Sequence, residues 1–188
     1  MEPLYRKVTA DKHDEQVVGF TDNINTLIVG DSVMERLIWF AKVKFPENVL
    51  VLAKGGDIIQ HLLWRLENTP NSDKITKIIV QIGQNNMFNK KVSAQAIADG
   101  IKKTVDLLSK KYPNASIFFI ELYYQKNVEK FKTDEVNRIT KSLIDKKFVD
   151  SFWTLILPNG YDNTKYDDEV HLNCDSYKKF YLMMLNLI

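Results

Sequence analysis

Apolar residues in this chain fall into two alternating kinds of segment. Short and nearly continuous apolar runs have the length and composition of buried strands. They occupy residues 26–30, 48–53, 75–83, 115–122 and 148–156. Between and after them, apolar residues recur every three or four positions, as in amphipathic helices. These periodic segments are residues 32–45, 57–68, 93–112, 131–147 and 174–188. The pattern therefore predicts five strands separated by helices.

The alternation of strands and helices predicts parallel β-α-β units with right-handed crossovers. The strand segments are nearly continuous apolar runs, which is typical of a sheet covered on both faces. We therefore predict an α/β fold, a three-layer α/β/α sandwich around a five-stranded parallel sheet of the flavodoxin-like type. Residues 1–23 are polar and only weakly periodic. They are interpreted as an N-terminal extension lying on one domain of residues 24–188.

The composition narrows the class of protein. Hydrophobic residues make up 45% of the 188 residues and charged residues 27%, as in a globular domain with a real core. A net charge of +2 gives no electrostatic argument for nucleic-acid binding. The single cysteine, Cys174, excludes an internal disulfide and a cysteine-rich zinc site. No apolar run approaches the ~20 residues of a membrane span, and the polar start does not resemble a secretory signal. We expect an intracellular, cytoplasmic protein.

Four polar or glycine-rich motifs follow the predicted strands. The first strand is followed by GDS (30–32), the second by KGGD (54–57) and the third by GQNN (83–86). A fourth motif, YDDEVHLN (166–173), lies between the last strand segment and the last helix. Because the carboxyl ends of parallel strands meet at one edge of a sheet, we expect these motifs to lie close together.

Each motif has a structural interpretation beside the chemical one. Ser32 precedes Glu35 by three residues, the spacing of a helix capping box, and taken alone this stretch favours a cap formed by Asp31 or Ser32. The other interpretation makes Ser32 a nucleophile at a helix N-terminus. Gly56 could simply complete a tight turn, or it could offer a backbone N–H to an oxyanion. Asn85 could cap a loop or donate its amide to the same oxyanion.

The chain has three histidines, and one of them has the surroundings of a general base. His13 lies in the polar extension and His61 on a predicted helix, whereas His171 lies in a loop. Asp168 precedes His171 by three residues, and a nearby carboxylate can orient an imidazole and stabilise its protonated form. Acidic residues on both sides of Asp168 leave the choice of carboxylate open.

Taken together, these motifs resemble the SGNH, or GDSL-type, hydrolases from about Thr26 to the C-terminus. The matching blocks are GDSV, GG, GQNN and DDEVHLN. Within that family the chain most resembles the catalytic subunits of intracellular platelet-activating-factor acetylhydrolase. Those subunits carry a stretch very similar to GGDIIQHLLWRLEN and the Gly-x-Asn-Asn form of the third block. Residues before Thr26 lie outside the resemblance.

The resemblance implies a role for five residues. Ser32 would be the nucleophile, His171 its general base and Asp168 the carboxylate that orients the histidine. The backbone N–H groups of Ser32 and Gly56 and the side chain of Asn85 would form an oxyanion hole. Members of the family need no metal or organic cofactor, and the acetylhydrolase subunits pair as dimers. The resemblance therefore implies a homodimer that acts without a cofactor.

Three further residues are predicted to line the acyl pocket. Gln84 stands where the acetylhydrolase subunits usually have a small threonine, next to the expected place of the acyl group. Val33 and Val170 are the other predicted neighbours of that group. A glutamine at position 84 would narrow or polarise the pocket, and this bears on a preference for acetyl groups.

The leading hypothesis is a serine esterase that hydrolyses short-acyl esters, acetyl esters above all and lipid esters among them, through an acyl-enzyme. The alternative is a binding module for RNA or protein that keeps the fold without catalysis, as in a retrotransposon-type esterase-like domain. Adjacent lysines such as Lys102 and Lys103 favour the alternative, although they are also typical of solvated helix faces. A third hypothesis is a structural subunit with the Trp64 helix as its contact surface. The complete set of five motif residues favours the enzyme.

Overall fold

A parallel five-stranded sheet forms the centre of the molecule. The computed structural model describes residues 1–40, 44–150 and 152–188. Its strands lie in the order β2-β1-β3-β4-β5, and every adjacent pair is parallel. The strands are β1 (Thr26–Gly30), β2 (Val49–Ala53), β3 (Lys77–Gln81), β4 (Ser116–Ile120) and β5 (Phe148–Val149). In the register, Gly30 pairs with both Ala53 and Gln81, so the first three strands end level with one another.

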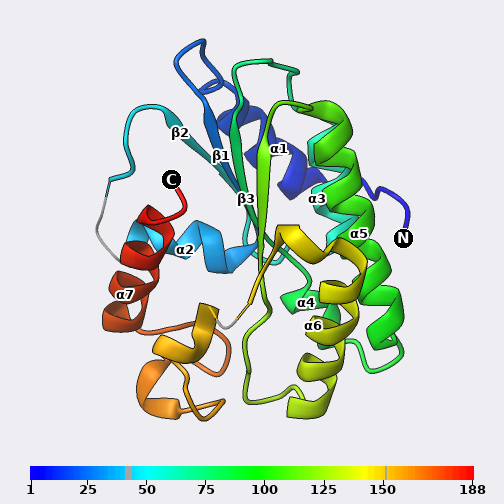
Figure 1. Cartoon of the computed structure of the whole chain (residues 1–188), viewed down its shortest axis with the longest axis vertical. Coiled ribbons are helices and arrows are strands. Elements are labelled where there is room, and N and C mark those ends of the chain that lie inside the picture. Colours follow the sequence, from blue (N-terminus) through cyan, green and yellow to red (C-terminus); the bar gives the residue numbers. More distant parts are fainter. Residues whose placement is uncertain (41–43, 151) are drawn as a thin grey trace.

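Helices cover both faces of this sheet, giving the predicted three layers (Figure 1). On one face α2 (Ser32–Phe40) packs against α7 (Cys174–Leu185). On the other face α5 (Ala94–Lys111) contacts both α3 (Ile59–Asn68) and α6 (Lys130–Ile144). No helix in the described parts of the chain is long and apolar enough to cross a membrane.

Alternation along the strands divides the core in two. In β1, Leu27 and Val29 belong to the cluster beneath α3 and α5, whereas Ile28 belongs to the cluster beneath α2 and α7. Successive side chains of a strand point to opposite faces, so a run that is apolar throughout serves both clusters. The central strands are therefore buried on both sides, and polar chemistry is confined to their ends.

Two helices differ from the predicted pattern. The predicted helix 32–45 is seen from Ser32 to Phe40, its residues 41–43 lie outside the described residues, and the prediction is wrong at Lys44 and Phe45, which are not helical. The short helix α4 (Gln84–Met87) was not predicted, because one turn is too brief to show a period. Helix α4 follows β3 directly, so it starts at the carboxyl edge of the sheet.

The predicted fifth strand over residues 148–156 is wrong beyond Val149, and Ser151 lies outside the described residues. Strand β5 has two residues, and Phe152–Leu155 form a 3-10 helix. Trp153 explains the turn away from the sheet, because its indole N–H donates to the Glu121 carbonyl over 2.6 Å while its ring packs on Phe180 of α7. An apolar run by itself does not distinguish a strand from a helical segment.

The N-terminal residues contain a helix that the sequence pattern did not indicate. Helix α1 (Lys7–Val17) packs against α3 and β2. Its buried residues are Thr9, Ala10 and His13, so two of the three are polar and no apolar stripe marks the helix. The boundary between an extension and a domain at residues 23 and 24 stays a prediction.

Candidate active site

Ser32 lies at the sharp turn between β1 and α2. At Gly30 an added Cβ would stand 2.3 Å from the Gln81 carbonyl oxygen, so only glycine allows the strands to approach this closely. Asp31 starts the helix, because its Oδ1 accepts the Val33 N–H over 3.0 Å. Of the two caps that the sequence allows, the structure has Asp31 and not Ser32. The cap belongs to Asp31, which leaves the Ser32 hydroxyl for another partner.

Glu35 has a different role from the one its spacing indicates. Its Oε2 accepts the Gly55 N–H over 2.8 Å, and this bond holds the glycine loop after β2 beside α2. An added Cβ on Gly55 would lie 2.8 Å from the same oxygen and 3.7 Å from the Ser32 Cβ. Gly56 has a φ of +77°, a left-handed conformation that favours glycine. Glycine is thus favoured at position 56 by its backbone conformation, whereas a side chain at position 55 would displace the Glu35 carboxylate.

His171 connects Ser32 to Asp168. Its Nε2 lies 2.9 Å from Ser32 Oγ, and its Nδ1 lies 2.8 Å from Asp168 Oδ2. The other carboxylate oxygen, Oδ1, accepts the backbone N–H groups of Val170 and His171 over 2.7 and 2.6 Å. A carboxylate at Nδ1 favours the tautomer with a proton there, which leaves Nε2 as an acceptor for the serine hydroxyl.

The structure selects one carboxylate from the acidic run. Glu169 points to Lys126 and Asn127, which contact its two oxygens over 2.6 Å each. Of the three acidic residues at positions 167–169, only Asp168 has a hydrogen bond with the His171 ring. Partial burial alone would raise the pKa of Asp168, but the hydrogen bonds from the His171 ring and from the backbone of His171 and Val170 lower that pKa to about 2. Asp168 is therefore ionised throughout the neutral range.

The other two histidines do not contact Ser32, although His61 Nδ1 lies 3.7 Å from Asp57 Oδ1 in the glycine loop. His13 is buried in α1 with its ring edge-on to Trp64, at 5.9 Å between centroids. His61 lies at the start of α3, where its Nδ1 accepts the Ile58 N–H over 3.4 Å. Burial lowers the pKa of both rings.

Potential oxyanion donors lie beside Ser32 on the side of β2 and β3. Among the described residues, the backbone N–H groups of Ser32 and Gly56 have no hydrogen-bond acceptor. Asn85, in α4, donates one amide hydrogen to the Asp57 carbonyl over 2.8 Å, and its second amide hydrogen has no acceptor in the described part of the chain. The next residue, Asn86, was missed from the sequence: its Oδ1 accepts the Ile59 N–H over 2.9 Å and so fixes the start of α3.

The three predicted pocket residues differ in exposure. Val33 is fully buried in the core beneath α2 and α7. Gln84 is also buried, and its amide donates to the Tyr123 carbonyl over 2.8 Å. Val170 is partly exposed, and its carbonyl accepts the Tyr123 hydroxyl over 2.8 Å. Gln84 and Val170 are thus linked through one tyrosine, and their place in the acyl pocket stays a prediction.

No family model matches the chain. Among curated proteins it is similar to platelet-activating factor acetylhydrolase IB subunit alpha2 of Rattus norvegicus, with 32% identity over 130 residues. That alignment covers 65% of this chain and 55% of the relative. Subunit alpha1 of Pongo abelii is 28% identical over 149 residues, covering 75% of this chain and 60% of the relative. The chain thus spans little more than half the length of the curated relatives it matches.

Solved structures share the fold. A protein of Streptococcus pneumoniae, provisionally described as a platelet activating factor, superposes with a TM-score of 0.76 at 17% identity, covering 96% of this chain and 90% of that one. A lipolytic G-D-S-L family protein of Veillonella parvula gives 0.66 at 16% identity, covering 87% and 97%. An acetylxylan esterase of Geobacillus stearothermophilus gives 0.64 at 15% identity, covering 86% and 92%. The chain therefore has the SGNH hydrolase fold, and the predicted resemblance is confirmed.

Proposed function

We propose that this protein is a serine esterase with Ser32 as its nucleophile, His171 as its general base and Asp168 as the orienting carboxylate. The observation that carries the proposal is the continuous line of contacts from Ser32 Oγ to His171 Nε2 and from His171 Nδ1 to Asp168 Oδ2, at 2.9 and 2.8 Å. Both distances lie within the range needed for proton transfer.

In the first half of the reaction, Ser32 Oγ attacks the carbonyl carbon of the ester while His171 Nε2 takes the hydroxyl proton. The ionised Asp168 stabilises the imidazolium that results. Charge develops on the former carbonyl oxygen, which the N–H groups of Ser32 and Gly56 and the free amide hydrogen of Asn85 would receive.

Collapse of the tetrahedral intermediate breaks the ester C–O bond. The imidazolium of His171 gives its proton to the departing alkoxide, so an alcohol leaves and the acyl group stays on Ser32. Water then attacks the acyl carbon, with His171 again taking a proton. The bond from Ser32 Oγ to the acyl group breaks, His171 returns the proton to Ser32 Oγ, and the carboxylic acid is released. The hydrolysis needs only water and the side chains named.

Acetyl esters are the proposed substrates. The curated relatives are named acetylhydrolases, and one structural neighbour is named an acetylxylan esterase. Catalytic mutants of that esterase alter a serine, an aspartate and a histidine, the last two three residues apart as Asp168 and His171 are here. With Gln84 placed in the acyl pocket, as we propose, a small acyl group is favoured, because this buried side chain occupies space and cannot swing away without losing its bond to the Tyr123 carbonyl.

A chain-length series of p-nitrophenyl esters tests this function. The acetate should be the best substrate, and Ser32→Ala should lower its hydrolysis by ~10³-fold or more. Ser116→Ala is the matched control, because Ser116 is exposed at the start of β4, away from the carboxyl edge of the sheet. Full activity in Ser32→Ala would contradict the mechanism. Inactivity of the parent towards every ester, with salt-dependent RNA binding, would favour the alternative of a binding module.

The likeness to acetylhydrolase subunits also carries a proposal about assembly. We propose that two copies of the chain pair as a homodimer. Equilibrium sedimentation of the purified protein should then give twice the mass of one chain. A monomer at micromolar concentration would contradict the proposal without affecting the proposed chemistry.

A further inference from the structure

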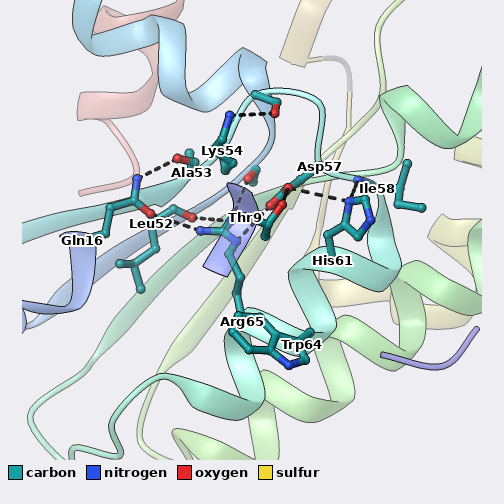
Figure 2. Close-up of polar contacts among 12 residues, drawn as sticks. Thr9, Gln16, Leu52, Ala53, Lys54, Asp57, Ile58, His61, Trp64 and Arg65 are labelled. Atoms are coloured by element: carbon teal, nitrogen blue, oxygen red, sulfur yellow. Dashed lines mark hydrogen bonds and ion pairs between the residues drawn. The ribbon is translucent and has the colours of Figure 1, made fainter. Parts of the chain in front are cut away.

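A buried polar network lies behind the proposed oxyanion donors. We define the Asp57 network as Thr9 and Gln16 of α1, Asp57 of the glycine loop and Arg65 of α3 (Figure 2). Thr9 and Asp57 are completely buried and Arg65 is 1% exposed. Burying an ion pair is costly and is weak evidence of a stabilising role, so the network calls for a different explanation.

Asp57 stands between two of the proposed donors. Its backbone follows Gly56 directly, and its carbonyl oxygen accepts the Asn85 amide over 2.8 Å. A shift of the Asp57 main chain would therefore move the Gly56 N–H and the Asn85 side chain together. The residues that fix the position of the Asp57 side chain therefore also fix the positions of the Gly56 N–H and the Asn85 amide.

Arg65 ties Asp57 to the sheet. Its Nε lies 2.9 Å from Asp57 Oδ2, and its Nη2 donates to the carbonyls of Gly30 and Leu52 over 3.0 and 2.9 Å. Gly30 ends the strand that leads to Ser32, so one guanidinium spans the nucleophile's strand and the donor loop. The planar fork of arginine suits several acceptors in fixed directions.

Helix α1 closes the network from the outside. The Thr9 hydroxyl donates to Asp57 Oδ1 over 2.8 Å. Gln16 accepts from Arg65 Nη1 over 3.2 Å and donates to the Ala53 carbonyl over 2.7 Å, as Figure 2 shows. Just before the helix, Arg6 Nη1 lies 3.6 Å from the position that a Cβ on Gly56 would take. The N-terminal segment therefore contacts the donor loop through the Asp57 side chain, and Arg6 lies next to Gly56.

The packing of α1 indicates that the helix positions the Asp57 network and does not merely cover the core. A covering helix normally buries an aliphatic stripe, whereas α1 buries Thr9, Ala10 and His13. Apart from the polar contacts, the ring of His13 in α1 and the ring of Tyr5 just before the helix both pack on Trp64 of α3. These contacts occupy the helix surface around Trp64 that the sequence offered as a partner site.

We infer that α1 is a working part of the active site, in which Thr9, Gln16 and Arg65 are positioning residues that set the Gly56 and Asn85 donors through Asp57. The inference rests on the proposed function. Donors that stabilise an oxyanion must stand within a fraction of an ångström of their place, so a loosened Asp57 would weaken the transition state more than the bound substrate.

Thr9→Val tests this directly, because valine keeps the shape and removes only the hydroxyl. With p-nitrophenyl acetate we expect kcat to fall ~10-fold with KM within about twofold of the parent, a fraction of the ~10²–10³-fold loss expected for Asn85→Ala. Binding of a small trifluoromethyl ketone, which forms a tetrahedral oxyanion on the serine, should weaken by a similar factor. Thr9→Ser, which restores a hydroxyl, should retain the parent values.

Thr104→Val is the matched control. Thr104 is equally buried, but its hydroxyl donates to the Gly100 carbonyl within α5. The inference is overturned if Thr9→Val keeps the parent kcat and ketone affinity, or if Thr104→Val loses as much. Should Thr9→Val not fold, Gln16→Met takes its place, with an expected ~3-fold loss in kcat at unchanged KM. An unchanged kcat would then overturn the inference.

Parent protein and Ser32→Ala, assayed in parallel, separate the two proposals. If the parent does not hydrolyse the ester, or if Ser32→Ala hydrolyses it equally well, the proposed function fails and the positioning role fails with it. If hydrolysis depends on Ser32 while the Thr9 variants match the parent, the function stands and only the positioning role fails.

Discussion

Two aspartates stand beside Ser32, one as its neighbour in the sequence and one brought there by the fold. Asp31 is fully buried, and its Oδ1 accepts the Val33 N–H. Its Oδ2 has no hydrogen-bond partner in the described structure. Asp168 is more exposed. Its Oδ2 has a hydrogen bond with the His171 ring, and its Oδ1 accepts the backbone N–H groups of Val170 and His171.

The pKa values of Asp31 and Asp168 are shifted in opposite directions. Burial raises the pKa of Asp31 to about 7, although the Val33 N–H works against the shift. For Asp168 the hydrogen bonds outweigh partial burial, and its pKa falls to about 2. Hydrogen bonds to the charged form therefore decide which carboxylate is a permanent anion, and nearness in sequence does not. Asp168 can stabilise an imidazolium, whereas Asp31 fits the role of a helix cap.

The largest predicted difference between the two aspartates is in catalysis. Asp168→Asn should lower kcat for p-nitrophenyl acetate by ~10³–10⁴-fold, because the amide neither stabilises the imidazolium nor enforces the tautomer. Asp31→Asn should stay within about threefold of the parent, because an asparagine still caps the helix. Steady-state kinetics of both variants checks this. Equal losses in the two variants would abolish the distinction.

The second difference is in the pH dependence of stability. The pKa of Asp31 in the folded state lies above its unfolded value of 3.8, so the folded protein binds the proton more tightly. Its contribution to stability is therefore greatest at low pH and is lost as the pH rises through about 7. Asp31→Asn resembles the protonated form, so its free energy of unfolding should exceed that of the parent by ~2–4 kcal/mol at pH 8.5. Urea denaturation at pH 4.5 should show much less of this gain, and an equal gain at both pH values would contradict the burial argument.

Asp168 should behave in the opposite sense and more weakly. Its folded pKa lies below the unfolded value, so its contribution is present above pH 3.8 and lost as the pH falls towards 2. The side chain is 44% exposed, and solvent screening reduces the contribution to about 1 kcal/mol. Asp168→Asn should therefore be destabilised by about that amount at pH 7, measured by urea denaturation. A variant as stable as the parent at pH 7 would show that the carboxylate serves catalysis alone.

The smallest effect is expected at Arg36. Its Nη1 lies 3.4 Å from Asp168 Oδ2, on the half-exposed side of the carboxylate. Such pairs contribute about 0–1 kcal/mol, so Arg36→Gln should change kcat by less than ~3-fold. Lys178→Gln, which breaks a comparable exposed pair with Asp175 on α7, is the control. A loss of kcat as large as that of Asp168→Asn would contradict this. It would mean that the Arg36 guanidinium keeps the Asp168 carboxylate in place, rather than its hydrogen bonds with Val170 and His171.

The strand ends were predictable because they follow a topological rule. Parallel strands separated by helices bring their carboxyl ends to one edge, so Ser32, Gly56 and Asn85 could be grouped before any contact was known. The Asp-His pair could be added from its spacing, although the acidic run left the carboxylate undecided. Only the fold shows that Glu169 points to Lys126 and leaves Asp168 to His171.

The missed elements share a physical cause, since their contacts are polar, long-range or both. Helix α1 carries no apolar stripe because it buries Thr9 and His13. Glu35 has the spacing of a cap, yet it accepts from Gly55 after the next strand. The apolar pattern of residues 152–155 predicts a continuation of the fifth strand, but these residues form a 3-10 helix in which the Trp153 indole N–H donates to the Glu121 carbonyl. Periodicity reports local burial and is silent on such pairings.

Labelling with a fluorophosphonate tests the proposed nucleophile most directly. An activated serine oxygen attacks phosphorus, fluoride leaves and a stable phosphonyl adduct remains on that residue. Intact mass and peptide mapping should find one adduct, on Ser32, and its formation should slow sharply in His171→Ala while Ser116→Ala labels like the parent. An adduct on another residue, or labelling of Ser32 that is indifferent to His171, would contradict the assignment.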